Sequence, residues 1–173
     1  MVRPRLWPAA ERIETRRLTL EPLRVDHADE MAPVLADEEL YEYIGGRPPT
    51  LEQLSDRFSR QVIGTSTDGT QGWLNWIVRH RETGAVLGTV QATIQQEIGG
   101  TAGELAWVIG IQHQRHGYAI EAAGGAARWL RDHGVDILIA HINPDHSASI
   151  GVARQLGMTA TDVTVDGEVR FSI

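Results

Sequence analysis

The segment WVIGIQHQRHGYAIEAAGGAARWL, Trp107–Leu130, decides the fold. It begins as an apolar strand and ends as an amphipathic helix, and a short polar run with one glycine joins the two. The first backbone N–H groups of an α-helix have no partner inside the helix and carry a partial positive charge, so a helix that follows a strand end can bind an anion. The segment therefore predicts a phosphate-binding turn made mainly of main-chain donors.

The residues of this junction suit such a turn. Gly117 lets a ligand approach the backbone closely, and Ala119 keeps the first helical turn free of bulk. Arg115 and His116 add side-chain donors, and Gln114 can hydrogen-bond without a charge. A plain polar loop that uses its glycine only to turn is the alternative interpretation. The run contains neither the phosphate-loop pattern GxxxxGK nor the three spaced glycines of a dinucleotide site, so neither of those sites is predicted.

The elements on either side of the junction predict a parallel pair of strands. Gly103–Ile111 is a strand, the helix runs from about Gly117 to His133, and Gly134 ends it. Val135–Ile142 is almost continuously apolar, as a strand covered on both faces should be. Because strand, helix and strand follow one another directly, we expect the two strands to be neighbours joined by a right-handed crossover.

The rest of the chain adds antiparallel strands and helices to this unit. Alternating and periodic apolar residues, with turn and cap residues between them, predict the following elements. They are a strand over Ile13–Leu23, a helix within residues 25–40 capped by Asp26, a helix from Thr50 with Gln53 in a capping box and Gly64 at its end, a hairpin around residues 81–84, a helix over Ser147–Leu156 and a terminal hairpin around Asp166-Gly167. The fold class is α/β with a mixed sheet.

Length and composition limit the classes of protein to which this chain can belong. The 173 residues predict one domain, 1–173, in which residues 1–12 form a loosely ordered N-terminal extension. The absence of cysteine excludes disulfides, thiolate metal sites and a catalytic thiol, and it fits a reducing compartment, so we expect a cytoplasmic protein. All 16 basic residues are arginines, which excludes Schiff-base lysine chemistry. The net charge of -7 argues against nucleic-acid and membrane partners and favours a cationic one.

The junction and its surroundings resemble a known family. QRHGYA, residues 114–119, is similar to the pyrophosphate loop of the GNAT superfamily of acyl-CoA-dependent N-acetyltransferases. IETRRLTLEPL and AGELAWVIG before the loop, with INPDHSASIGVARQLGM after it, are similar to the branch that contains ribosomal-protein alanine and serine N-acetyltransferases. The resemblance covers roughly residues 13–173. It implies a mostly antiparallel central sheet with a splayed parallel strand pair flanked by helices.

The resemblance also implies an acetyl-CoA site with no metal. The diphosphate of coenzyme A would bind the loop amides, the pantetheine arm would pair with the end of the strand before the loop, and residues after the second parallel strand would contact the arm. The implied contacts are Val108, Ile109, Ile111, Gln114, Arg115, His116, Gly117, Tyr118, Ala119, Asn143, His146 and Ser149. His146 stands where the branch usually has asparagine, and Asn143 can equally be a turn residue before Pro144.

Two residues are implied to act in catalysis. Glu104 matches the position of the general base in many family members, and Ser149 is placed to stabilise the departing thiolate. From the residues alone, Glu104 can also be an exposed strand carboxylate, and Ser149 a hydroxyl bonded to its own helix start. The oxyanion donor is expected to be an N–H near Val108 or Ile109 in a bulged strand. Ala153 stands where many members carry a tyrosine acid, so no tyrosine acid is expected.

The implied activity is transfer of an acetyl group from acetyl-CoA to a primary amine in a ternary complex, without an acyl-enzyme. The acceptor is a protein N-terminal α-amine or a small-molecule amine. The acidic run Asp37–Gly46 is expected near its entrance and would suit a cationic amine, but it can equally be a solvated loop that connects two helices. A monomer or homodimer is expected. Two alternatives remain at this point: a non-catalytic acyl-CoA-binding sensor or scaffold, and a metal enzyme that uses His113 with His116 or His141 with His146.

Overall fold

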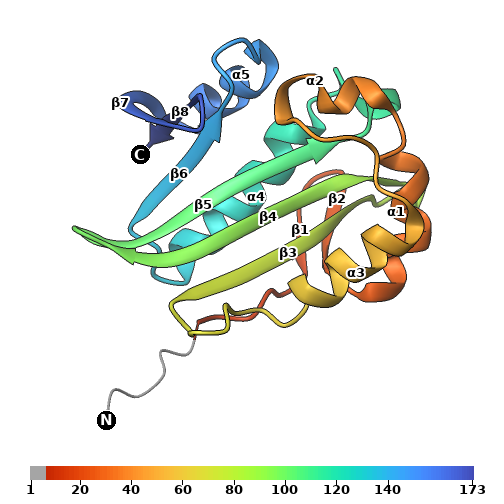
Figure 1. Ribbon diagram of the computed structural model, residues 1–173, viewed down its shortest axis with the longest axis horizontal. Helices are drawn as coiled ribbons and strands as arrows, with labels where there is room; N and C mark the ends of the chain where they lie inside the picture. The colour runs from red at the N-terminus through yellow and green to blue at the C-terminus, as the bar shows by residue number, and fades with distance from the viewer. Residues whose placement is uncertain (1–6) are drawn as a thin grey trace.

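The computed structural model describes residues 7–173, which form one eight-stranded sheet with helices on both faces (Figure 1). The strand order is β1-β2-β3-β4-β5-β6-β8-β7. The strands are β1 Ile13–Glu14, β2 Leu18–Pro22, β3 Gln71–His80, β4 Val86–Glu97, β5 Gly100–Ile109, β6 Ile137–Ile142, β7 Thr159–Val165 and β8 Glu168–Ser172. Every neighbouring pair is antiparallel except β5 and β6, which confirms the predicted sheet type.

Helices of both the α and the 3-10 type connect the strands. The α-helices are α1 Ala28–Val34, α2 Tyr41–Ile44, α3 Leu51–Gln61, α4 Tyr118–Asp132 and α5 Ser147–Gln155, and the 3-10 turns are η1 Val25–His27, η2 Glu38–Leu40 and η3 Ile111–His113. Within the described part of the chain, no helix is long and apolar enough to cross a membrane.

The two faces of the sheet carry separate cores. Along β3, Trp76 packs in a cluster with Ala126 of α4, whereas the next residue, Ile77, packs in a second cluster with Met31 of α1 and Phe58 of α3. Successive side chains of a strand point to opposite faces, so this alternation places α4 on one face and α1 with α3 on the other. Figure 1 shows the same arrangement, with α4 behind the sheet and α1 and α3 in front.

The parallel pair separates part of the way along its length. Ala102, Gly103 and Glu104 of β5 pair with residues 137–139 of β6, and the pairing stops there. Beyond it β5 stays paired with β4 as far as Ile109, while β6 turns to β8 through residues 139–142. The predicted splay is therefore present, and the end of β5 has no strand neighbour on its β6 side.

Two predicted elements differ from the structure. The strand predicted over Ile13–Leu23 is two short strands, because the Thr15 N–H and hydroxyl both donate to the Leu18 carbonyl and fold β1 back on β2. The helix predicted within residues 25–40 ends at Val34, and Asp37 then accepts a bond from Glu39 N–H to start η2. Asp26 is not a cap: its carboxylate pairs with Arg24.

The beginning of the described chain is tied to the sheet. The Trp7 indole donates to the Gly69 carbonyl, and the Trp76 indole donates to the Glu11 carbonyl. A Cβ on Gly72 would lie 2.5 Å from Trp7 Cβ, so Trp7 packs directly on β3. Residues 7–12 of the predicted extension are thus held against the sheet, and residues 1–6 lie outside the described residues.

Candidate active site

The backbone between β5 and α4 forms a tight turn with two left-handed residues. Arg115 and Gly117 both have left-handed backbone, with φ of 63° and 76°. Glu121 N–H is bonded to the Gly117 carbonyl, so the N–H groups of residues 118–120 have no partner inside α4. Main-chain amides that point out of a helix start, beside left-handed residues, form a concave site for phosphate or carboxylate oxygens.

A partly buried ion pair holds this helix start against the beginning of β2. Arg17 Nε lies 2.7 Å from Glu121 Oε2, and Arg17 Nη1 donates to the His116 carbonyl at 2.8 Å. The other carboxylate oxygen, Glu121 Oε1, accepts bonds from the Thr15 hydroxyl and the Arg17 N–H. Burial alone would raise the pKa of the Glu121 carboxyl, but the bonds from Arg17 and Thr15 outweigh it and hold that pKa below its ordinary value.

Replacing Glu121 by alanine should lower the free energy of unfolding by about 2–3 kcal/mol at pH 7, because it leaves Arg17 without its partner. A carboxyl whose pKa is depressed in the folded state stabilises above its unfolded pKa, and this contribution disappears as the pH falls through the folded value. The difference between wild type and variant should therefore shrink from pH 5 to pH 3 in urea unfolding. Glu14→Ala, at an exposed ion pair, is the control and should cost less than about 1 kcal/mol. A difference that stays constant with pH would contradict this assignment.

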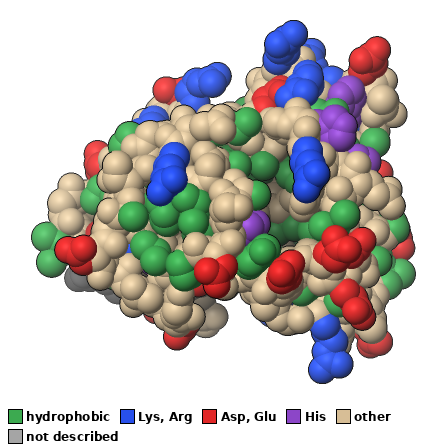
Figure 2. Space-filling model, turned by 90° about the horizontal axis from the view of Figure 1, so that it is seen from above, with side chains coloured by type: hydrophobic (Ala, Val, Ile, Leu, Met, Phe, Trp, Pro, Cys, Tyr) green, Lys and Arg blue, Asp and Glu red, His purple; other side chains and the backbone are tan. Residues whose placement is uncertain are grey.

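A first cavity of about 510 Å³ opens beside the helix start. Residues of the η3–α4 loop, the end of β5, α5, and the acidic segment with Glu39 and Glu42 form its walls. Figure 2 looks down on this end of the molecule and shows hydrophobic side chains within the hollow. The cavity thus runs from the start of α4 along the free side of β5.

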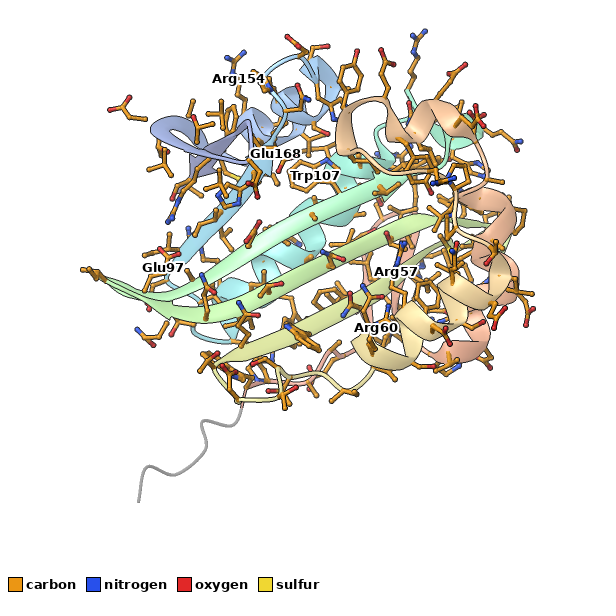
Figure 3. All side chains as sticks on the ribbon, in the orientation of Figure 1. Arg57, Arg60, Glu97, Trp107, Arg154 and Glu168 are labelled. Atoms are coloured by element: carbon orange, nitrogen blue, oxygen red, sulfur yellow. The ribbon has the colours of Figure 1, made fainter. Side chains whose placement is uncertain are left out.

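A second cavity of about 290 Å³ lies between β4, β5, β6 and β8. Figure 3 shows Trp107 of β5 and Glu168 of β8 at the splayed end of the sheet, and both line this cavity. The two cavities share part of their walls. The shared residues are Tyr43, Ile44, Trp107, Val108, His146 and Ser149. A ligand in one cavity can therefore meet a ligand in the other at the splay.

Glu104 lies in the second cavity and is not an unpartnered surface carboxylate. Its Oε1 accepts a bond of 2.7 Å from His141 Nδ1, and its side chain is 44% exposed. Glu168 lines the same cavity. Burial raises the pKa of the Glu168 carboxyl, His141 opposes this shift, and Glu104 and Asp166 add to it. The second cavity therefore brings together two carboxylates and two imidazoles, those of His141 and His146.

His146 and Ser149 lie where the cavities meet. His146 Nε2 is 3.4 Å from Ser149 Oγ, and the His146 ring stacks on Tyr43 with centroids 4.6 Å apart. Burial lowers the pKa of the His146 imidazole, with a small opposing contribution from Glu42, so the ring is neutral at pH 7. A neutral imidazole can donate one hydrogen bond and accept another, which suits a contact with both Ser149 and a polar arm of a ligand.

Backbone groups at the end of β5 are unpaired, but a bulge in the strand is not the cause. The pairing of β5 with β4 runs without a register shift from Gly100 to Ile109, so the expected bulge near Val108 is wrong. The register shift lies one strand away, between β3 and β4 at Val78 and Arg79. Departure of β6, rather than a bulge, leaves N–H and C=O groups of β5 open toward the cavities.

Most of the implied cofactor residues line the first cavity, and His116 does not. Val108, Ile109, Ile111, Gln114, Arg115, Gly117, Tyr118, Ala119, His146 and Ser149 line the first cavity. Gln114 also braces the site, because its Nε2 donates to the Ile109 carbonyl. His116 does not line the cavity: its Nδ1 lies 2.7 Å from the Gln114 carbonyl, and its ring stacks on Tyr118.

Asn143 and Ala153 do not line the first cavity. Asn143 lines the second cavity, and its Oδ1 accepts a bond from Asp145 N–H, as a turn residue does. Ala153 is fully buried in the core on the α4 face. No group of three His, Cys, Asp or Glu residues that could hold a metal ion lies within residues 7–173.

Comparisons with known proteins agree with this geometry. The acetyltransferase (GNAT) domain family matches residues 17–159, which is most of the chain. The chain belongs to the GNAT acetyltransferase family. It is therefore an acyl-CoA-dependent N-acetyltransferase, as the resemblance of the loop implied. No curated protein matches the sequence.

Solved structures place this acetyltransferase in the same fold. A GNAT-family acetyltransferase from Bacillus anthracis is 17% identical, with a TM-score of 0.73 over 94% of this chain and 98% of the other. An acetyltransferase from Agrobacterium tumefaciens is 24% identical, with a TM-score of 0.71 over 99% and 98%. A ribosomal L7/L12 alpha-N-protein acetyltransferase in complex with coenzyme A is 14% identical, with a TM-score of 0.76 over 94% and 97%.

Several contacts in the site cannot be predicted from local sequence patterns. Arg17 and Glu121 act together across 104 positions of sequence, which no local pattern reveals. Tyr43 and Ile44 reach the meeting point of the cavities from a four-residue helix, too short to be predicted from periodicity. His141 did carry a signal, because it is the single polar residue in the strand Ile137–Ile142.

Proposed function

We propose that this acetyltransferase moves the acetyl group of acetyl-CoA to a primary amine by direct attack in a ternary complex. The observation that carries the proposal is the meeting of two cavities at the splay of β5 and β6. One cavity ends on a helix start that favours an anion, and the other holds carboxylates that favour an ammonium group. Two substrates of opposite charge can thus present their reacting atoms to each other.

Coenzyme A fits the first cavity by the chemistry of its walls. The unpaired N–H groups of residues 118–120 would hold the diphosphate, with Arg115 beside them. The pantetheine arm would pair with the free side of β5 near Val108 and Ile109, as an added strand does. The thioester would then lie near Ser149, at the wall shared by both cavities.

The chain's own groups supply what aminolysis of a thioester needs. An amide N–H near Val108 or Ile109 stabilises the oxygen that gains charge in the tetrahedral intermediate. The C–N bond forms, the C–S bond breaks, and the Ser149 hydroxyl hydrogen-bonds the departing thiolate, which takes up a proton. The chain has no cysteine to carry the acetyl group, and the shared wall of the two cavities lets it pass directly to the amine. Holding both reactants in attack geometry contributes the largest part of the rate.

The acceptor is an amine without a neighbouring carboxylate. Glu104 and Glu168 line the second cavity, and none of its described lining residues is Arg or Lys. The carboxylate of a free amino acid would be repelled by these two carboxylates, and no cation in the cavity lining would neutralise it. The N-terminal α-amine of a protein, or a small-molecule amine, lacks that penalty. An α-amine with a pKa near ~8 is also roughly one-tenth neutral at pH 7, against about four in ten thousand for a lysine side chain.

An acceptor panel tests the proposal. With acetyl-CoA at pH 7, peptides amidated at the C-terminus and small amines should be acetylated, with kcat/KM for α-amines about 100-fold above that for a lysine side chain. Free amino acids should react more slowly than their amides. Thiol release and mass spectrometry of the products measure both. Acetyl-CoA that binds but is transferred to no amine would contradict the proposal and indicate an acyl-CoA-binding sensor or scaffold.

A further inference from the structure

His141 is the polar residue of an otherwise apolar strand, and the proposed chemistry leaves it without a role. It lies on the face of β6 opposite to Leu138, Ala140 and Ile142, which pack in the core with α4. Its side chain is 17% exposed, lines the second cavity, and holds Glu104 by the 2.7 Å bond. A hydrophobic residue at this mostly buried position would stabilise the sheet more than a histidine does. The presence of an imidazole therefore indicates a chemical role.

The strand register places His141 nearer to the thioester than Glu104. Glu104 pairs with Ile139 at the last paired position of β5 and β6, and His141 lies two residues further along β6 in the same direction. A strand rises about 3.3 Å per residue, which puts the backbone of His141 about 7 Å beyond that of Glu104 along the strand direction, toward the end where β5 and β6 separate. The carboxylate therefore stands behind the imidazole along the line toward the cofactor.

The hydrogen bond between the two groups fixes which ring nitrogen is free. An ionised carboxylate only accepts hydrogen bonds, so Nδ1 of His141 donates its proton to Glu104 and Nε2 keeps its lone pair. No hydrogen-bond partner for this Nε2 lies among the described residues. Within the described chain, His27 Nε2 is the one buried side-chain atom that has no hydrogen-bond partner. The Nε2 atom of His141 is therefore not buried, and a ligand or water can reach it.

Charged groups surround the imidazole on several elements. Glu104 of β5 and Glu168 of β8 line the cavity with it, and Arg170 of β8 is its direct partner in the strand pairing. Arg170 is neutralised by Glu97 of β4, at 2.8 Å. The carboxylates of Glu104 and Glu168 are therefore the unpaired charges that face the imidazole in this cavity.

We propose that His141, oriented by Glu104, is the base that accepts the proton of the acceptor amine, directly or through one water. This inference rests on the proposed function. As the amine nitrogen attacks the thioester carbon, the C–N bond forms and an N–H proton passes to Nε2. The C–S bond then breaks, the sulfur leaves with its electron pair and is protonated, and His141 returns its proton to solvent. Glu104 is a positioning residue that keeps the tautomer and stabilises the imidazolium.

The pH dependence of kcat/KM, calculated for the neutral form of the best acceptor of the panel so that the ionisation of the amine itself is removed, tests this assignment. A histidine base gives an acid limb near neutral pH, whereas a glutamate base gives one about two units lower. His141→Gln should lower kcat/KM by about 100-fold or more at pH 7 and remove the limb. Glu104→Gln should cost less and keep the limb, because the imidazole base is still present and has lost only the carboxylate that orients it. Imidazole in the buffer should restore part of the activity of His141→Ala.

Controls separate this role from folding and from the proposed function. His133→Gln, at the end of α4 and outside both cavities, should keep wild-type kinetics. Binding of coenzyme A and thermal unfolding should be the same in the His141 and Glu104 variants as in wild type. An active wild type whose His141→Gln variant keeps the acid limb, while Glu104→Gln loses it, would overturn this inference alone. A wild type that acetylates no amine would overturn the proposed function as well.

Discussion

Replacing Ala119 by glutamate is expected to weaken acetyl-CoA binding at least about 100-fold while leaving the protein as stable as wild type. Ala119 is the second residue of α4 and lines the first cavity. A carboxylate in the first turn of a helix is stabilising by about 0.3–1 kcal/mol, because it lies near the free N–H groups. The same carboxylate would compete with the diphosphate for those N–H groups and repel it. A 100-fold loss corresponds to about 2.7 kcal/mol.

Ala119→Gln is the matched control for the Ala119→Glu variant. It adds a side chain of nearly the same size without the charge, so any loss it shows measures crowding alone. Calorimetric titration with acetyl-CoA gives the affinities, and thermal unfolding gives the stabilities. Equal affinities for the Glu and Gln variants would show that the helix start does not hold the diphosphate.

Replacing Gly88 by alanine is expected to destabilise the protein by about 1–3 kcal/mol and to remove most of its acetyltransferase activity. A Cβ on Gly88 would lie 1.9 Å from the Val108 carbonyl oxygen and 2.9 Å from Ile109 Cα. These are backbone atoms, which cannot rotate away as a side chain would, so the end of β5 must move. That segment is the proposed pairing site of pantetheine and the source of the oxyanion donor.

Gly124→Ala is the control for the Gly88→Ala variant. Gly124 lies inside α4, and an added Cβ would make an ordinary contact of 3.6 Å with Leu156. Alanine should stabilise this helix by about 0.5–1 kcal/mol without a change in activity. Urea unfolding and kinetics at a temperature where both variants are folded measure the effects. A Gly88→Ala protein with wild-type stability and activity would contradict the assigned geometry of β5.

The sequence predicts the parts of the site that local patterns govern. Gly117 precedes α4, with left-handed backbone, and the directly successive strand, helix and strand form a parallel pair. The terminal hairpin turns at Asp166 and Gly167, both with positive φ, as an Asp-Gly turn requires. These features depend on residues within a few positions of one another, so pattern and turn chemistry are sufficient to predict them.

The rest depends on contacts between distant segments. The Arg17–Glu121 pair needs β2 beside α4, and the Glu104–His141 bond needs the parallel register, neither of which a linear pattern contains. The bulge expected in β5 came from the need for a free N–H, but departure of β6 meets the same need. Long-range pairing, rather than local propensity, therefore determines which groups face the reacting atoms.

A crystal structure of the protein with coenzyme A is the most direct test of the central claim, that the start of α4 binds the diphosphate. We expect diphosphate oxygens within about 3.2 Å of backbone N–H groups among residues 118–120, and the pantetheine arm along the free side of β5 near Val108. Coenzyme A bound elsewhere on the protein, with these N–H groups in contact with water alone, would contradict it.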